Sequence, residues 1–403
     1  MIRRPPRSTH CISSAASDVY KRQALGSIKS QIGHTKAAAG VAGLIKASLA
    51  LYHKVLPPTI KVAKPAESLS AADTPFYINT EARPWIPRGD HPRRAGVSAL
   101  GFGGSNFHCL LEEHQSAKQV VDWDGDVQII PFSAANDAGL KEQLNAFDAE
   151  VGWTQLRFEA DKQRQLYQPT DLSRLILVVE KDQTKCSAQL QKALSLLEKN
   201  SAEQGWETPD GIYYGAGKSA GSTALLFPGQ GAQYPGMLKD LALQFPEFLS
   251  SLSDADRTFA DNSGSSLVDL IYPLPQFTAE AKQTATAALQ ATEVAQPALG
   301  AVSLAAGRVL ARFGMSADAV AGHSYGELVA LCAAEVFSTA DLHNLSRLRG
   351  ELMAAGEGDR GSMVAVSAPL EQVETFLTEE SLDLVLANRN TCLLYTSPSP
   401  RDS

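Results

Sequence analysis

The sequence predicts an α/β protein of two or three domains. Its 403 residues are 44% hydrophobic and 20% charged, which at roughly 150 residues per domain is enough for more than one core. Two glycine-containing motifs, at 29–40 and 322–327, each lie between a short strand-like run and a helical pattern. Between these motifs, short strands and polar helices alternate. Together these patterns predict a mosaic of α/β parts without an internal repeat.

Composition and charge exclude several classes of protein. The net charge of −8, from 36 basic and 44 acidic residues, argues against a nucleic-acid binder that relies on phosphate neutralisation. No apolar run reaches the length of about 18 residues that a membrane span needs. Five scattered cysteines, without a C-x-x-C pair, predict reduced thiols in a cytoplasmic protein and no zinc site or disulfide framework. They are Cys11, Cys109, Cys186, Cys332 and Cys392.

The two ends of the chain differ from the rest. Residues 1–23 hold five basic residues and one acidic residue, without apolar periodicity. A transit peptide would account for this end alone, whereas residues 392–403, CLLYTSPSPRDS, have a similar character. We interpret both as non-native sequence that flanks a chain of 24–391, and we expect disorder in them.

The first chemical motif is Lys29-Ser-Gln-Ile-Gly-His34. A strand is predicted over 25–29 and a helix over about 35–51, whose Ala and Gly residues permit close packing. His34 precedes the helix, where the dipole favours negative charge. A neutral imidazole there can donate a hydrogen bond to a thioester or enolate oxygen. A buried structural histidine is the alternative.

Residues 114–220 contain no glycine-rich loop and no converging His, Ser or Cys side chains. This composition indicates a structural adaptor. Its predicted strands are 127–131 and 175–180, and its predicted helices are 138–150 and 187–199.

The second chemical motif is Gly322-His323-Ser324-Tyr325-Gly326-Glu327, a G-x-S-x-G sequence. A strand over 317–322 and a helix to about Phe337 flank it, and an earlier strand over 223–227 leads into the turn Pro228–Gln233. This is the pattern of a nucleophile elbow, in which a serine occupies a strained turn at a helix N-terminus. A lipase or esterase, or a plain turn, would also fit this motif by itself.

Four sequences, in this order, resemble the C-terminal half of the thiolase-like β-ketoacyl synthases: LGSIKSQIGHTKAAAGVAGLIKASLAL, LPPT at 56–59, PFYINTEARPW at 75–85 and PRRAGVSALGFGGSNFHCLLEE at 92–113. The resemblance implies that Lys29 and His34 are active-site residues. It also implies that Phe102 gates an acyl channel and that Asn106 anchors its loop, whereas by itself the loop is an ordinary turn. The family's upstream cysteine and first histidine have no counterpart, since Cys11 and His10 match no family motif. We therefore expect this half-site to be unable to condense substrates alone.

Three later sequences, FPGQGAQYPGM, ATEVAQPAL and GHSYGE, resemble malonyl-CoA:acyl-carrier-protein acyltransferases, which have an α/β-hydrolase-like fold. The resemblance implies that Ser324 is the acyl-accepting nucleophile. The backbone N–H groups of Gln230 and Tyr325 would form the oxyanion hole. Gln296 and His323 would line the substrate site.

Arg349, in a predicted helix over 341–355, bears on the substrate. In malonyl-type enzymes an arginine in this setting binds the free carboxylate, for which a guanidinium fork is suited. Arg347 is the rival, and a solvated helix arginine is the alternative. The family's catalytic histidine has no counterpart, because His343 is the one histidine after Ser324 and matches no family position.

Residues 363–367, 370–378 and 382–390 predict strand, helix and strand. They resemble the first half of the ferredoxin-like subdomain of these acyltransferases, which would be truncated here. The expected domains are 24–113 (ketosynthase part), 114–220 (linker) and 221–391 (acyltransferase).

This order is that of a modular megasynthase, and the motifs are closer to the large subunit of polyunsaturated-fatty-acid synthases than to type I polyketide synthases. The resemblance implies a cytoplasmic, homodimeric parent that loads malonyl-CoA onto Ser324 and passes malonyl to the phosphopantetheine thiol of an acyl carrier protein. The ketosynthase would then condense it with an acyl chain. No metal is implied, and NADPH would belong to other domains. Because both sites lack partners, we expect this chain to be impaired. A serine hydrolase and a non-catalytic scaffold remain as alternatives.

Overall fold

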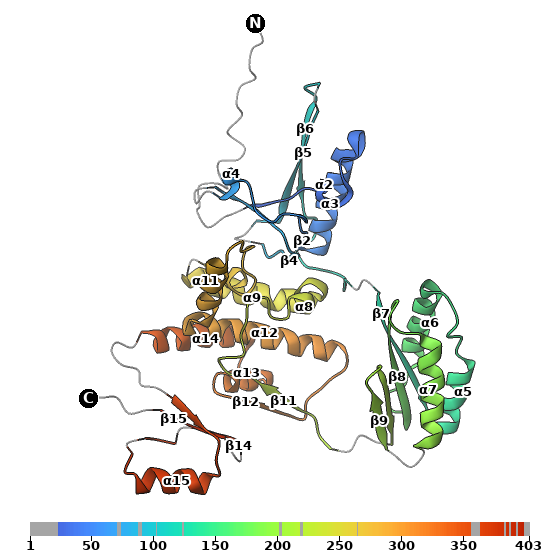
Figure 1. The fold of residues 1–403 in the computed structure, drawn as a ribbon, viewed down its shortest axis with the longest axis vertical. Helices are drawn as coiled ribbons and strands as arrows, with labels where there is room; N and C mark the ends of the chain where they lie inside the picture. The colour runs from blue at the N-terminus through green and yellow to red at the C-terminus, as the bar shows by residue number, and fades with distance from the viewer. Residues whose placement is uncertain are drawn as a thin grey trace. The chain divides into compact units, whose positions relative to one another are not determined.

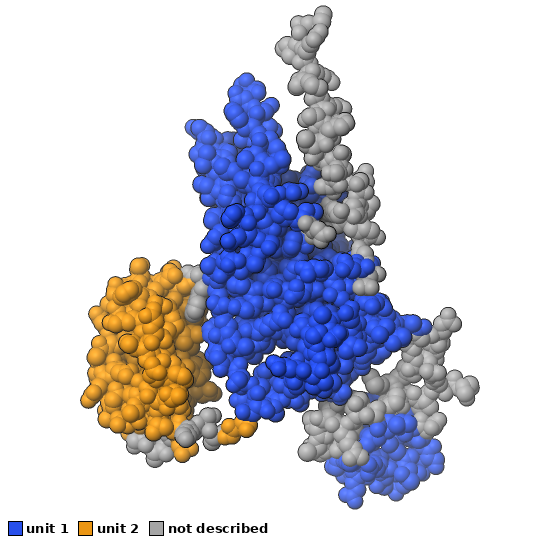
Figure 2. All heavy atoms as spheres, turned by 180° about the vertical axis from the view of Figure 1, so that it is seen from behind, with its two compact units in different colours: residues 1–121, 223–403 blue, residues 122–222 orange. Residues whose placement is uncertain are grey.

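The computed structural model divides into two compact units, one formed by residues 1–121 with 223–403 and the other by residues 122–222 (Figure 2). Phe102, the gate implied by the resemblance, lies outside the described residues. The structure describes residues 23–70, 74–87, 91–101, 103–122, 125–200, 204–217, 221–263, 265–355, 363–382, 384–386, 388–391 and 394–398.

The smaller unit is a four-stranded antiparallel sheet with three helices on one face (Figure 1). Its strands, in spatial order, are β7 (Val127–Ala134), β8 (Ser173–Glu180), β10 (Ile212–Ala216) and β9 (Gly205–Thr208), and its helices are α5 (Asp137–Ala146), α6 (Trp153–Leu166) and α7 (Cys186–Lys199). Apolar side chains alternate along β8, so one face of the sheet is buried against all three helices. The predicted strands and helices are confirmed in position, whereas α6, β9 and β10 had no counterpart in the prediction.

The first part of the larger unit, residues 23–121, is built on one helix and one hairpin. Its elements are β1 (Gln23–Leu25), α2 (Lys29–Ile32), the 3₁₀ turn η1 (Lys36–Ala38), α3 (Ala39–His53), β2 (Val55–Leu56), α4 (Glu67–Ser70), β3 (Phe76–Ile78), β4 (Arg83–Pro84), β5 (Arg94–Leu100) and β6 (Asn106–Glu112). β5 and β6 pair in full antiparallel register. At Gly40 and Gly43 an added Cβ would lie 3.1–3.2 Å from side chains of β5, so the predicted close packing of the helix is confirmed.

The local structure around Lys29 differs from the prediction. The strand expected over 25–29 ends at Leu25, and Lys29 begins α2. Gly33, at φ 73°, ends that short helix, a conformation that glycine adopts without steric cost. The next helical segment then begins as the 3₁₀ turn η1 and continues as α3 to His53.

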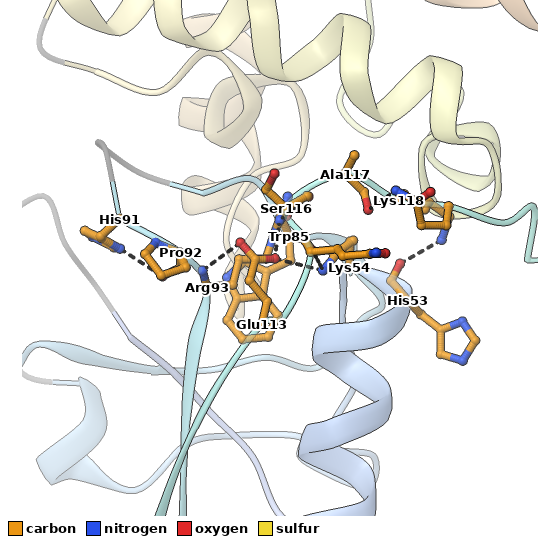
Figure 3. Close-up of polar contacts among 12 residues, drawn as sticks. His53, Lys54, Trp85, His91, Pro92, Arg93, Glu113, Ser116, Ala117 and Lys118 are labelled. Atoms are coloured by element: carbon orange, nitrogen blue, oxygen red, sulfur yellow. Dashed lines mark hydrogen bonds and ion pairs between the residues drawn. The ribbon is translucent and has the colours of Figure 1, made fainter.

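A buried ionic cluster joins α3 to the hairpin (Figure 3). Glu113 Oε2 accepts hydrogen bonds from Lys54 Nζ at 2.8 Å and from Arg93 Nη1 at 2.7 Å, and the three side chains are only 2–4% exposed. Burial acts to raise the pKa of Glu113, but the hydrogen bonds from Lys54 and Arg93 outweigh it, and the pKa lies below its usual value. Glu113 is therefore an ionised link between two buried cations.

The second part of the larger unit, residues 223–355, surrounds two parallel strands with helices. They are β11 (Ala224–Phe227), α8 (Lys239–Gln244), α9 (Pro246–Ser263), α10 (Leu267–Ile271), α11 (Ala279–Gln290), α12 (Thr292–Arg312), β12 (Ala319–Gly322), α13 (Gly326–Ala333) and α14 (Thr339–Ala354). α12 is the core helix and contributes residues to both buried apolar clusters of this part. Within the described chain, α12 alone has the length and composition of a membrane-crossing helix, but 61% of its most apolar window is buried inside the protein. Its composition follows from its central position.

The two parts of this unit are linked by an arginine. Arg83 of β4 is 5% exposed, and its Nη2 donates to Asp269 Oδ1 of α10 at 2.9 Å and to the carbonyl oxygen of Tyr272 at 2.5 Å. Its Nη1 donates to Tyr77 Oη at 3.0 Å. Ile86 and Val121 also pack against the apolar cluster that surrounds α12.

The C-terminal segment contains β13 (Met363–Val366), α15 (Leu370–Glu379), β14 (Asn388–Thr391) and β15 (Leu394–Pro398). The strands form an antiparallel sheet in the order β13-β15-β14. The expectation of disorder over 392–403 is wrong for 394–398. A segment with Tyr395 and Thr396, which favour extended structure, completes hydrogen bonds along the edges of both other strands.

Candidate functional site

Ser324 occupies a strained turn between β12 and α13. Its φ of 52° lies in the left-handed region, which is uncommon for a residue with a side chain. The glycines two positions to either side permit this turn. An added Cβ at Gly322 would lie 2.0 Å from the carbonyl carbon of Gly326, and one at Gly326 would lie 2.2 Å from the carbonyl oxygen of Phe227. The side chain of Ser324 is exposed at the start of the helix, as in a nucleophile elbow.

The turn after β11 lies beside Ser324 because β11 and β12 pair in parallel, with Phe227 opposite Gly322. The N–H of His323 donates to the carbonyl oxygen of Phe227 at 3.0 Å. At Gly229 an added Cβ would lie 3.2 Å from Ser324 Cβ, so this turn approaches the serine closely. Gln230 is the next residue, which places its backbone close to Ser324.

A chain of polar side chains extends from Gln230 to Arg349. Gln230 Nε2 donates to Thr292 Oγ1 at 2.9 Å, and Gln296 Nε2 donates to the same hydroxyl oxygen at 3.0 Å. Arg349 Nη1 donates to Gln296 Oε1 at 2.7 Å. Gln296 is fully buried, and Met353 Sδ lies 3.2 Å from its Nε2. The predicted residues Gln230, Gln296 and Arg349 are therefore brought together by direct contacts.

Tyr325 connects the serine turn to α14, the helix that carries Arg349. The tyrosine is fully buried, and its Oη lies 2.5 Å from Ser346 Oγ, which donates to the carbonyl oxygen of Leu342 at 2.6 Å. An added Cβ at Gly300 would lie 2.1 Å from the phenol oxygen, so glycine is required there. Burial raises the pKa of Tyr325, and its hydrogen bond to Ser346 and the charge of Arg349 act to lower it. Ser346 and Arg349 are three residues apart and share a helix face.

The backbone N–H of Tyr325 lies at the N-cap of α13, where it has no acceptor within the helix. This N–H and the Gln230 turn flank Ser324. Donors so placed can stabilise an oxyanion that forms on an acyl group at the serine. His323 is exposed next to Ser324.

The rival arginine has a different environment. Arg347 Nη1 donates to both carboxylate oxygens of Glu351, at 2.6 and 2.7 Å, one helical turn further along α14. Arg349 instead contacts Gln296, whose neighbours reach the serine turn. His343 is buried on α14, and its Nε2 has no hydrogen-bond partner.

The ketosynthase-like residues form no comparable set. Lys29 and His34 are exposed on α2 and just before η1. Nδ1 of His34 accepts a hydrogen bond from the N–H of Lys36 at 3.0 Å, so a neutral imidazole carries its proton on Nε2. Asn106 is exposed at the start of β6, opposite Leu100.

Two residues of the site were not predicted, Thr292 and Ser346. Thr292 precedes Gln296 by four residues, so the two share a helix face, and this spacing is a signal that the sequence contains. Ser346 offers no such signal, because its partner Tyr325 lies on another helix.

Comparisons with known proteins agree with this architecture. The acyl transferase domain matches residues 224–392, the C-terminal domain of β-ketoacyl synthases matches residues 9–63, and the ketoacyl-synthetase C-terminal extension matches residues 65–157. The expected domain boundaries stay predictions, since the first ketosynthase match begins before Ala24 and the extension runs across residue 113.

One chain of a polyunsaturated fatty acid synthase from Thraustochytrium sp. is 34% identical over 379 residues, covering 87% of this chain and 13% of that protein. Polyketide synthase GfsA from Streptomyces halstedii is 35% identical over 352 residues, covering 86% of this chain and 4% of that protein. The acyl transferase domain of ZmaA superposes with a TM-score of 0.52 at 25% identity, covering 68% of this chain and 60% of that one.

The fold and the serine turn thus define an acyltransferase domain, preceded by the C-terminal region of a ketosynthase and its extension. The chain belongs to the family of modular synthases that includes polyunsaturated fatty acid synthases and type I polyketide synthases. The identities to the two kinds of relative are nearly equal, and the chain spans a small share of each.

Proposed function

We propose that Ser324 accepts a malonyl group from malonyl-CoA and that Arg349 binds the free carboxylate of this group. The observation that supports this proposal best is the hydrogen-bonded chain from Gln230, beside the strained serine, to the Arg349 guanidinium. It places a cation within one polar network with the turn that carries the nucleophile. A guanidinium fork suits a carboxylate better than an ammonium group does.

In the proposed reaction, Ser324 Oγ attacks the thioester carbonyl while the N–H groups of Gln230 and Tyr325 stabilise the oxyanion. The C–S bond breaks, CoA leaves as its thiol with the serine proton, and an ester remains on Ser324. The thiol of a carrier-protein phosphopantetheine then attacks this ester, which regenerates the serine and yields malonyl thioester. The catalytic histidine of the resemblance has no counterpart here, so we expect slow acylation. Within the parent synthase, a homodimeric cytoplasmic assembly, the malonyl unit would next be condensed by the ketosynthase.

Ligand binding tests the proposal without depending on the rate of acylation. Calorimetry with the full chain should show tighter binding of malonyl-CoA than of acetyl-CoA. Arg349→Gln should weaken malonyl-CoA binding by about tenfold to a hundredfold and leave acetyl-CoA binding unchanged, because a charge-assisted hydrogen bond is lost. Arg347→Gln is the matched control on the same helix. The proposal is wrong if Arg347→Gln causes the loss, or if wild type binds both thioesters equally.

A covalent test separates the proposal from the serine hydrolase and scaffold alternatives. Intact-mass spectrometry after prolonged incubation with malonyl-CoA should show a slowly formed malonyl adduct that is absent in Ser324→Ala. Rapid hydrolysis of p-nitrophenyl esters, in preference to reaction with malonyl-CoA, would instead support a hydrolase.

A further inference from the structure

The hydroxyl of Thr292 lies between the two glutamines of the site. It accepts from Gln230 Nε2 at 2.9 Å and from Gln296 Nε2 at 3.0 Å, and its own proton points to Gln230 Oε1 at 3.3 Å. We propose that Thr292 is a positioning residue, whose hydroxyl fixes the separation between the Gln230 oxyanion donor and the Arg349 guanidinium. This inference rests on the proposed function and assigns a role to a residue that touches neither end of the acyl group.

The donor and acceptor count supports this role. A threonine hydroxyl has one proton and two acceptor lone pairs, and all three are used here. Arg349 has only donors, so Gln296 must turn its Oε1 towards the guanidinium and its Nε2 towards Thr292. Without the hydroxyl, Gln296 Nε2 would keep only the weak sulfur acceptor of Met353 and the more distant Gln230 Oε1, at 3.4 Å.

Burial makes the contact consequential. Gln296 is fully buried, so water cannot readily replace a lost partner. The backbones of α12 and α14 also meet at this point, since an added Cβ at Gly350 would lie 3.0 Å from the carbonyl oxygen of Thr292. Arg349, the residue before Gly350, therefore leaves a helix that is packed against Thr292 itself. A change at this hydroxyl is transmitted to the guanidinium through one fixed side chain.

The consequence concerns the length of the acyl group. Gln230 acts at the thioester end of malonate, and Arg349 acts at its free carboxylate. Thr292 connects the residues at both ends, so loss of its hydroxyl should impair ligands that contact both. An acetyl group, which has no free carboxylate, should be affected little.

Calorimetry on the full chain tests this role with Thr292→Val, which keeps the shape of the side chain, and with Thr292→Ser, which keeps the hydroxyl. Thr292→Val should weaken malonyl-CoA binding about tenfold, the effect of one lost hydrogen bond to a buried polar group. Acetyl-CoA binding should not change, and Thr292→Ser should restore malonyl-CoA binding. Thr284→Val is the matched control, because the hydroxyl of Thr284 bonds only its own helix, α11, at an exposed position.

Two results would overturn the role: unchanged malonyl-CoA binding in Thr292→Val, or an equal loss for both thioesters, which marks a purely structural residue. If wild type itself shows no preference for malonyl-CoA, the proposed function is wrong. A crystal structure of Thr292→Val then decides this inference independently. A displaced Gln296 amide and Arg349 guanidinium would support it, and an unchanged hydrogen bond between them would overturn it.

Discussion

The two parts of the larger unit, residues 23–121 and 223–355, each contain a catalytic-type motif, but their interiors differ. In the first part, buried polar side chains such as Lys54, Arg93 and Glu113 are prominent, and among the described residues few apolar side chains are buried. In the second part, two apolar clusters surround α12 and Tyr325. The first part is held by a polar network and the second by apolar packing.

This difference coincides with the state of the two motifs. α3 carries a stripe of exposed apolar side chains, Val41, Ile45 and Leu49, each at least 50% exposed, and Lys29 and His34 are also exposed. Around Ser324, by contrast, packed helices hold Gln230, Gln296 and Arg349 in contact. A motif supplies chemical groups, whereas a site requires that packing on several sides fixes their separation.

The largest expected effect concerns the polar network. Glu113→Ala should lower the free energy of unfolding by about 3–5 kcal/mol, because it leaves the buried cations of Lys54 and Arg93 without their anion. Glu112→Ala is the matched control, since Glu112 pairs with Arg94 at 2.8 Å where both side chains are more than half exposed. Its cost should be about 0–1 kcal/mol. Equal costs in urea unfolding would show that burial does not govern the first part.

A steric change tests the apolar packing of the second part. Gly326→Ala should cost about 3 kcal/mol of stability, because the new Cβ would lie 2.2 Å from the carbonyl oxygen of Phe227 and must displace backbone. Gly307→Ala, on α12 with nothing within 4 Å of the added Cβ, should instead stabilise the chain by about 0.5–1 kcal/mol. Thermal unfolding measures both. A mild effect of Gly326→Ala would mean that the serine turn is adaptable.

Sequence patterns predicted the local features of this fold well. The serine turn, its flanking strands and the positions of Gln230, Gln296 and Arg349 follow from motifs in which nearest neighbours along the chain decide the structure. Arg349 and Arg347 could not be separated by pattern, because both lie on α14, and only their different partners, Gln296 and Glu351, distinguish them.

Features that depend on distant partners escaped prediction. Glu113 looked like the end of a strand, yet its role comes from Lys54, 59 residues earlier. Ser346 has its role through a tyrosine 21 residues away on another helix. β15 gains its structure from pairing with β13 and β14, because a short polar segment is ordered by strand edges rather than by its own composition.

The smallest expected effect separates the two parts by pH. His343 on α14 is buried near Asp254 of α9 and Arg308 of α12. Burial lowers its pKa, the charge of Arg308 acts in the same direction, and Asp254 acts to raise it. The unfolded chain therefore binds a proton that the folded chain excludes. Stability should fall as pH drops below about 6.5 and continue to fall until the pKa of the folded state is reached.

Urea unfolding between pH 7.5 and 5.5 checks this prediction. His343→Gln should show a shallower loss of stability than wild type, because the side chain no longer titrates. His34→Gln, at an exposed histidine of the first part, serves as the control and should retain the wild-type slope. Equal slopes for all three proteins would show that the buried histidine does not couple folding of α14, and with it the placement of Arg349, to protonation.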